Sequence, residues 1–147
     1  MTQATRQNLL EIGADVFMRQ GYNSTGLSAL LKRADVPKGS FYHYFKSKED
    51  FGVAVVEEFS SKYLEHMDRF FANTTLPPLE RLAAYFADGI EFMNCEQCKA
   101  GCLFGSLGQE MSSQNEALRH HIDKAMAAQA KRIRACLDEA MEENQLS

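Results

Sequence analysis

Three cysteines lie within eight residues near the middle of the sequence, at Cys95, Cys98 and Cys102. A thiolate is a strong nucleophile and a good metal ligand, and a nearby positive charge favours its formation. Lys99 lies inside the cluster, so we expect a cation to lower a thiol pKa there. The spacing predicts a sensor of electrophiles or oxidants, with Cys102 as the reacting residue and Cys95 and Cys98 beside it.

Two other kinds of thiol chemistry are alternatives for the same residues. A structural zinc site needs four ligands, and the candidates for a fourth are Cys136 or the pair His120 and His121, all distant in sequence. A cysteine-dependent enzyme would use Cys102 as nucleophile and one of these histidines as base. No catalytic signature, glycine-rich phosphate loop or converging pair of carboxylates accompanies them. We therefore expect a protein that is not an enzyme, with no catalytic residues, no bound metal and no cofactor.

The charge of the chain is unevenly distributed. The net charge of −4 argues against nucleic acid, but residues 1–48 carry seven basic and three acidic side chains, a net of +4, and the other 99 residues sum to −8. Binding to phosphates depends on the local field rather than on the total charge. The distribution indicates a protein that contacts a polyanion through its N-terminal end only.

The spacing of apolar residues predicts an all-α protein. The sequence has only three prolines and nine glycines, and no segment alternates as a strand does. We expect helices over about 6–20, 28–34, 38–45, 48–71, 79–93, 103–111 and 114–144. N-terminal caps are expected from Thr5 for the first helix, from Ser47 for the fourth and from Ser113 for the last.

Apolar stripes suggest which faces are buried. The inner face of the 79–93 helix should carry Leu82, Ala83, Phe86 and Ile90. Aromatic residues from Phe59 to Phe92 could line a pocket, although such stripes are more often plain core.

Two short helices joined by a tight turn indicate a helix-turn-helix, whose second helix lies in the major groove. The turn is predicted at Asp35-Val36-Pro37, because the residue before proline is pushed out of helical geometry and proline suits the first turn of a new helix. Asp35 stands where glycine is common, and aspartate tolerates left-handed geometry better than most residues.

Export and membrane insertion are not indicated. No apolar run approaches the roughly 20 residues that a membrane span requires, and the start, residues 1–7, is polar. We expect a soluble, cytoplasmic protein with no membrane partner. All four cysteines are then expected to be reduced thiols rather than disulfides.

Two segments of the sequence are similar to those of a known family. They are Gly26-Leu27-Ser28-Ala29-Leu30-Leu31 and the segment from Val36 to Glu49, VPKGSFYHYFKSKE. These segments resemble the DNA-binding signature of the TetR/AcrR family of bacterial repressors, over about residues 6–55. The resemblance implies a helix-turn-helix domain at 1–48, a helical effector-sensing and dimerisation region at 49–147, and a homodimeric repressor of double-stranded operator DNA. The expected DNA-binding residues are Ser24, Thr25, Lys38, Gly39, Ser40, Tyr42, His43, Lys46 and Lys48.

Elementary physics agrees with these positions. Residues 38–40 begin the second helix, where free backbone N–H groups and the helix dipole attract anions. Phe41 and Phe45 should face the core to hold so short a helix, and alignment with the family favours Tyr42 over Tyr44 at the DNA. For Ser24 and Thr25 an alternative role is to cap the next helix.

Gly101-Cys102-Leu103, followed by a short helix to Met111, resembles the subgroup of TetR-like repressors that control reductases for reactive electrophiles. The resemblance implies that modification of Cys102, or binding of a small molecule, relieves operator binding. A small cysteine after glycine also has a packing explanation. A regulator that binds DNA constitutively is a further alternative.

Typical members of the family continue with two further helices that form a four-helix dimer interface. The resemblance therefore implies a shortened chain, or dimerisation through the 114–144 helix. Its stripe from Met126 to Met141 would then serve as that surface, or would be core left exposed.

Overall fold

The structure is a computed structural model that describes residues 3–97, 99–111 and 115–146, and within these residues it is entirely helical, which confirms the predicted all-α class. The helices are α1 (Gln3–Gln20), α2 (Leu27–Ala34), α3 (Lys38–Tyr44), α4 (Lys48–Phe71), α5 (Pro78–Cys95), α6 (Leu103–Met111) and α7 (Glu116–Glu142). Among the described residues no helix is long and apolar enough to cross a membrane.

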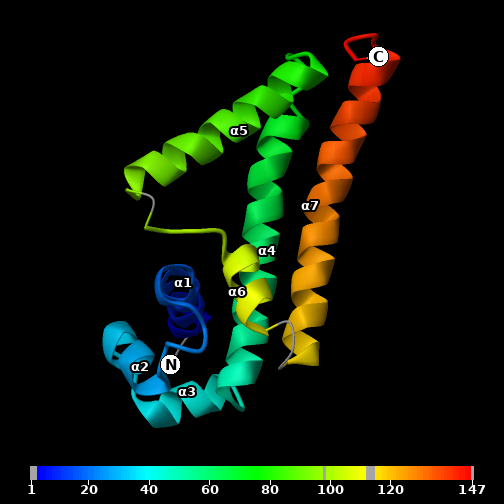
Figure 1. Cartoon of the computed structure of the whole chain (residues 1–147). Coiled ribbons are helices and arrows are strands. Elements are labelled where there is room, and N and C mark those ends of the chain that lie inside the picture. The colour runs from blue at the N-terminus through cyan, green and yellow to red at the C-terminus, as the bar shows by residue number, and fades with distance from the viewer. Residues whose placement is uncertain (1–2, 98, 112–114, 147) are drawn as a thin grey trace.

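The long helices α4 and α7 run side by side and form the axis of the molecule (Figure 1). Helices α1, α2 and α3 gather around the N-terminal end of α4, whereas α5 leaves its other end and leans away from the bundle. The short helix α6 lies between, in contact with both α1 and α7. One helix, α4, therefore runs from the basic N-terminal segment into the acidic remainder of the chain.

One of the three N-terminal caps predicted from the sequence is confirmed. Ser47 Oγ accepts a hydrogen bond from Asp50 N at 3.0 Å, which confirms the cap of α4. The cap expected from Thr5 is wrong, because α1 already begins at Gln3. Ser113 lies outside the described residues, and α7 is capped by Asn115, whose Oδ1 accepts from Leu118 N at 2.9 Å.

Four buried phenylalanines hold the N-terminal helices together. The ring of Phe51, at the start of α4, lies 6.0 Å from that of Phe17 in α1, 5.4 Å from Phe41 and 4.9 Å from Phe45, centroid to centroid. All four side chains are almost inaccessible to solvent. The prediction that Phe41 and Phe45 face the core is confirmed.

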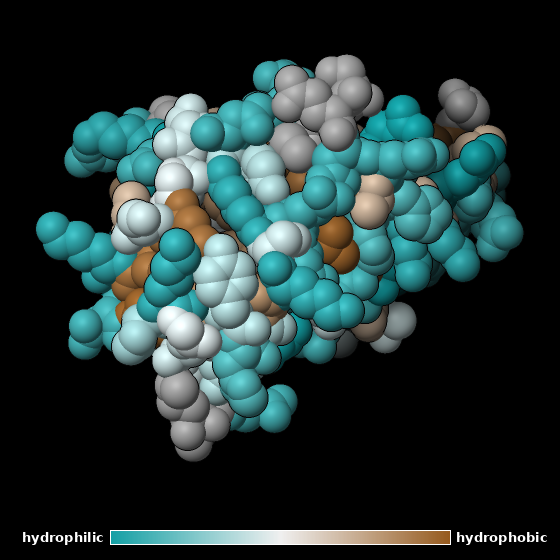
Figure 2. Space-filling model, turned by 90° about the horizontal axis from the view of Figure 1, so that it is seen from below, coloured by the Kyte–Doolittle hydropathy of each residue, from teal (hydrophilic) through white to brown (hydrophobic). Residues whose placement is uncertain are grey.

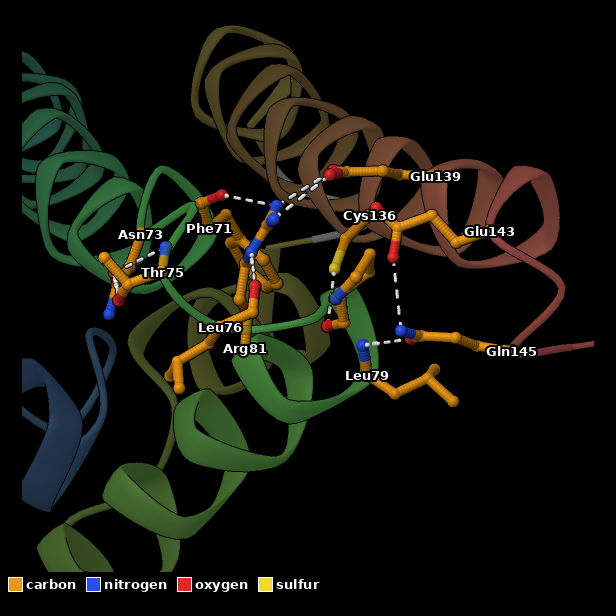
Figure 3. A network of polar contacts seen from close by, with 11 residues as sticks. Phe71, Asn73, Thr75, Leu76, Leu79, Arg81, Cys136, Glu139, Glu143 and Gln145 are labelled. Atoms are coloured by element: carbon orange, nitrogen blue, oxygen red, sulfur yellow. Dashed lines mark hydrogen bonds and ion pairs between the residues drawn. The ribbon is translucent and has the colours of Figure 1, made fainter.

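A buried arginine closes the opposite end of the bundle (Figure 3). Arg81 of α5 is 5% exposed, and it donates to Leu76 O at 2.7 Å, to Phe71 O at 3.4 Å and to both carboxylate oxygens of Glu139 at 2.8 and 3.1 Å. Nearby, Cys136 Sγ donates to a backbone carbonyl of α5 at 3.1 Å. Arg81 thus joins the end of α4, the start of α5 and α7.

The expected inner face of α5 is wrong. Phe86 is 53% exposed and Ile90 61% exposed, and Ala83 is exposed as well. Polar residues face α4 instead, since Tyr85 and Asp88 hydrogen-bond to side chains of that helix. The apolar pattern indicated a face, but contacts with α4 selected a different one.

We expect Arg81→Met to lower the free energy of unfolding by about 2 kcal/mol, because it removes charged hydrogen bonds to two backbone carbonyls, while Glu139, whose side chain is 40% exposed, stays accessible to water. Urea unfolding followed by circular dichroism measures the loss. The matched control is Arg132→Met, which removes an exposed pair with Asp68 (2.7 and 3.1 Å) and should cost less than about 1 kcal/mol. Equal losses in the two variants would contradict the assigned role of Arg81.

Candidate nucleic-acid interface and sensing site

The connection between α2 and α3 is a tight turn. Asp35 adopts left-handed geometry, with φ 53° and ψ 44°, and its backbone N–H bonds back to Lys32 O at 3.3 Å. Val36 N donates to Leu31 O at 3.1 Å, and Pro37 O then accepts the first helical bonds of α3. An aspartate therefore occupies the left-handed position predicted for it, and the helix-turn-helix is formed by local bonds.

Helix α3 has one buried and one exposed face. Since Phe41 and Phe45 point into the core, Lys38, Tyr42 and His43 are left exposed. Tyr42 is 48% exposed, whereas Tyr44 is half-buried, so exposure agrees with the choice of Tyr42 as the tyrosine that faces outward.

The backbone at Gly39 also lies open, since a Cβ built there would meet nothing within 4 Å. Ser24, before α2, and Lys46, after α3, are exposed as well. Six of the nine expected contact residues therefore lie on accessible surface around α3.

The structure does not bring Thr25, Ser40 and Lys48 to that exposed surface. Thr25 is 2% exposed and its Oγ1 donates to Gly21 O at 2.7 Å, while Ser40 is also buried. Lys48 Nζ donates to Tyr22 O at 2.7 Å and lies 4.4 Å from the centre of that ring, and burial lowers the pKa of this lysine. Thr25 and Lys48 instead hold the backbone of the connection between α1 and α2.

The alternative role of Ser24 or Thr25, to cap the next helix, is wrong. Gly26 is the N-cap residue of α2, with no side-chain hydrogen bond at that position.

Part of the basic charge of this segment is neutralised internally. Asp15 accepts from both Arg19 and Arg33. Burial acts to raise the pKa of Asp15, but hydrogen bonds from the two arginines outweigh it and hold that pKa below its usual value. The face seen from below, where α2 and α3 lie, is mostly hydrophilic, with apolar atoms between long polar side chains (Figure 2). Exposed lysines 32, 38 and 46 supply its positive charge.

Three of the four cysteines lie among the described residues, two of them at one loop and the third in the bundle. Cys95 and Cys102 are exposed at the two ends of the loop between α5 and α6, and Cys136 is buried in the bundle, where burial raises its pKa. Cys98 lies outside the described residues. In the described part of the chain no group of three His, Cys, Asp or Glu side chains has the geometry of a metal site, so the zinc alternative has no support there.

Polar residues of α4 and α5 pair with one another near the start of α6. Tyr63 Oη and Tyr85 Oη are 2.6 Å apart, and His66 Nε2 lies 2.7 Å from Asp88 Oδ2. Burial raises the pKa of Tyr63, and the hydrogen bond with the Tyr85 hydroxyl raises it further. The ring of Phe104, two residues after Cys102, lies 6.0 Å from that of Tyr63, so Cys102 directly precedes a helix that packs against this pair.

Sequence reasoning missed Tyr85 and Asp88. A signal was present, since Tyr63 and His66 on one helix and Tyr85 and Asp88 on the next share the i, i+3 spacing that places both members of a pair on one helix face.

Comparison with known families accounts for both halves of the chain. Residues 9–55 match the bacterial regulatory proteins of the tetR family, and residues 78–147 match the tetracyclin repressor-like C-terminal domain. The turn at Asp35 and helix α3 lie within the first match, and helices α5, α6 and α7 lie within the second.

Among characterised relatives, the transcriptional regulator AcuR of Cereibacter sphaeroides is 41% identical over 73% of this chain and 49% of its own length. The HTH-type transcriptional repressor NemR of Escherichia coli is 36% identical over 94% of this chain and 67% of its own. The chain thus spans about half the length of AcuR and two thirds of that of NemR.

Solved structures give the same result. A regulatory protein TetR from Rhodobacter sphaeroides superposes with a TM-score of 0.94 at 34% identity, over 99% of this chain and 77% of that one. The reduced form of E. coli NemR superposes with a TM-score of 0.89 at 33% identity, over 96% and 73%. These matches are transcriptional regulators and not enzymes, and the chain belongs to the TetR family of bacterial regulatory proteins.

Proposed function

We propose that this chain carries the DNA-binding and sensing parts of a transcriptional repressor, and that α3 enters the major groove of operator DNA. The observation that carries the proposal is the two-faced α3, with Phe41 and Phe45 packed on Phe51 and with Lys38, Tyr42 and His43 exposed. A rigid helix that presents polar side chains from a basic surface suits a groove that admits one α-helix.

The proposed contacts divide into two kinds. Lys38 and Gly39, at the start of α3, with Tyr42 and His43 one turn on, lie where side chains reach base edges or the nearest phosphates. Ser24 and Lys46 flank α3 and are assigned to phosphates. Residues 1–48 form the DNA-binding domain in this proposal, and residues 49–147 form the sensing region.

A homodimer belongs to the same proposal. One two-turn helix contacts only a few base pairs, so repressors of this kind pair two such helices across half-sites about one helical turn apart or more. The partner is a second copy of the protein, and the bound DNA is a double-stranded operator with related half-sites.

We expect Lys38→Ala and Lys46→Ala each to weaken DNA binding and to reduce the slope of log K against log salt by about 0.9 for each bound subunit, because each removes one phosphate contact per subunit. The duplex is selected from a random-sequence library with the wild-type chain, and fluorescence anisotropy gives the affinity between 50 and 200 mM salt, a range over which such contacts change affinity by orders of magnitude (~10³-fold for six or more).

The matched control is Lys131→Ala, which removes an exposed lysine of α7 far along the chain from α3. It should leave both affinity and slope unchanged. A slope that falls equally in all three variants, or in none, contradicts the assigned contact surface.

We further infer that modification of Cys102 relieves operator binding. Its thiolate adds to the β-carbon of an electron-poor alkene, a C–S bond forms as the C=C π bond breaks, and the resulting carbanion takes a proton from water. Support comes from the exposed Cys102 at the start of α6, from the packing of Phe104 in the first turn of that helix on Tyr63 of α4, and from the similarity to NemR, whose solved structure is of a reduced form.

We expect N-ethylmaleimide to weaken binding of the selected duplex at least tenfold in the wild-type chain and to leave Cys102→Ser unaffected. Cys95→Ser, which removes another exposed thiol next to this loop, should respond as the wild type does. Anisotropy measures the affinity, and mass spectrometry of peptides identifies the modified cysteine. Equal release in Cys102→Ser would show that the sensor lies elsewhere.

A further inference from the structure

A carboxylate on α6 holds the connection between α1 and α2. Glu110 Oε1 accepts a hydrogen bond from Tyr22 N at 3.0 Å, and Glu110 Oε2 accepts one from Asn23 N at 2.8 Å. The partners are 88 and 87 residues apart in sequence. Hydrogen bonds from backbone N–H groups to an ionised carboxylate are shorter and stronger than those between neutral groups. This double contact joins the helix that follows Cys102 to the helices that carry the DNA-binding surface.

The backbone between α1 and α2 has a conformation that leaves room for the Glu110 carboxylate. Gly21 has a φ of +82°, a left-handed conformation that glycine adopts without strain. A Cβ built on Gly21 would lie 2.3 Å from Glu110 Oε1, so any other residue would displace the carboxylate. Close approach of the two elements therefore depends on this glycine, an observation independent of the hydrogen bonds.

Tyr22 is the point at which the N-terminal helices meet. Its ring lies 5.2 Å from that of Phe17 in α1, and a Cβ built on Gly52 of α4 would lie 2.9 Å from that ring. Tyr22 O accepts from Lys48 Nζ at 2.7 Å and from Thr25 N at 3.2 Å. A displacement of the Tyr22 backbone thus reaches α1, the start of α2 and the start of α4 together.

Helix α6, which follows Cys102 and carries Glu110, is a short helix with a buried face. Leu103, Phe104 and Leu107 are buried, and the Phe104 ring lies 5.4 Å from Phe59 and 6.0 Å from Tyr63 in α4. Cys102 O accepts the bond of the first turn from Ser106 N at 2.9 Å. A group added to the sulfur of Cys102 needs space at this first turn, and making that space displaces α6. Because α6 is a rigid helix of nine residues, the displacement reaches Glu110.

We propose that Glu110 is the positioning residue through which a change at Cys102 reaches the DNA-binding helices. The inference rests on the proposed function of Cys102, and adds to it the route of the signal. In the unmodified chain the carboxylate holds Tyr22 N and Asn23 N in place. Displacement of α6 breaks these two bonds, and this difference in contacts between two states is what coupling between distant sites requires.

A second contact between the two regions supplies a matched control. Glu96, in the loop that follows Cys95, pairs with Arg19 of α1. Both side chains are about one third exposed, and Arg19 keeps Asp15 as a partner at 2.8 Å. Exposed pairs contribute little free energy, so Glu96→Gln should leave coupling intact. Gln109→Ala, at an exposed neighbour of Glu110 on α6, controls for a change in the helix itself.

The test measures amide hydrogen exchange at Tyr22 and Asn23 by NMR, before and after N-ethylmaleimide modifies Cys102. In the wild type we expect modification to speed exchange at both amides at least tenfold. In Glu110→Ala exchange should be fast from the start and unchanged by modification. Glu110→Gln, which keeps the shape but only one acceptor oxygen, should give an intermediate result if the alanine variant proves too unstable to study.

The second readout is the ratio of DNA affinities without and with modification. It should fall from at least tenfold in the wild type to less than twofold in Glu110→Ala, and stay at the wild-type value in Glu96→Gln and Gln109→Ala. A merely structural role would shift both affinities equally and leave the ratio unchanged. Amides that stay protected in the modified wild type, or a ratio unchanged in Glu110→Ala, would overturn the proposal.

The two readouts separate this proposal from the proposed function. If modification does not change DNA affinity in the wild type, the proposed role of Cys102 fails. The exchange measurement still decides whether a signal from Cys102 reaches Tyr22, because it requires no DNA.

Discussion

The contact of Phe51 with Phe17, Phe41 and Phe45 is the interaction on which the rest of the structure depends. Helix α3 has seven residues, and an isolated helix shorter than about 12 residues is marginal in water. Its position is therefore set by the burial of Phe41 and of Phe45, the residue that follows the helix, each worth about 2 kcal/mol. Because that burial fixes one face of α3 on α4, it also fixes which residues the other face presents.

Helix α4 also connects the DNA-binding helices to the proposed sensing region. From Phe51 near its start, α4 continues without a break to Tyr63 and His66, which pair with residues of α5, and Tyr63 also packs on Phe104 of α6. The second link is Glu110 of α6, which does not involve α4 and accepts two hydrogen bonds from the backbone between α1 and α2. The DNA-binding helices are therefore held by a rigid helix on one side and by a pair of hydrogen bonds on the other. Of these two connections, the hydrogen bonds are the one that a small displacement can break.

Features set by neighbouring residues were predictable from the sequence. The left-handed turn at Asp35, the cap at Ser47 and the inward orientation of Phe41 and Phe45 all follow from local geometry and from the period of a helix. Family resemblance then added the function of the exposed face, which no local rule supplies.

Features set by distant partners were not predictable in the same way. Thr25 is a turn residue with a buried hydroxyl, because its partner is the carbonyl of Gly21, and Lys48 points inward because Tyr22 offers both a carbonyl and a ring. Helix α5 turns its apolar side outward, since Tyr85 and Asp88 find partners on α4. Nothing in the sequence indicated the contact made by Glu110, because its partners are backbone N–H groups and every residue except proline has one.

The central claim is that the exposed face of α3 is the DNA-binding surface, and amide chemical-shift mapping tests it most directly. NMR suits a protein of 16.6 kDa per subunit, and it detects binding even at the weak Kd of non-specific DNA contacts, roughly 10⁻⁴ to 10⁻⁶ M. With a duplex selected by the wild-type chain, the account predicts shifts at Ser24, residues 38–43 and Lys46, and none along the exposed faces of α5 and α7. Shifts centred on α5 or α7, with α3 unperturbed, would contradict it.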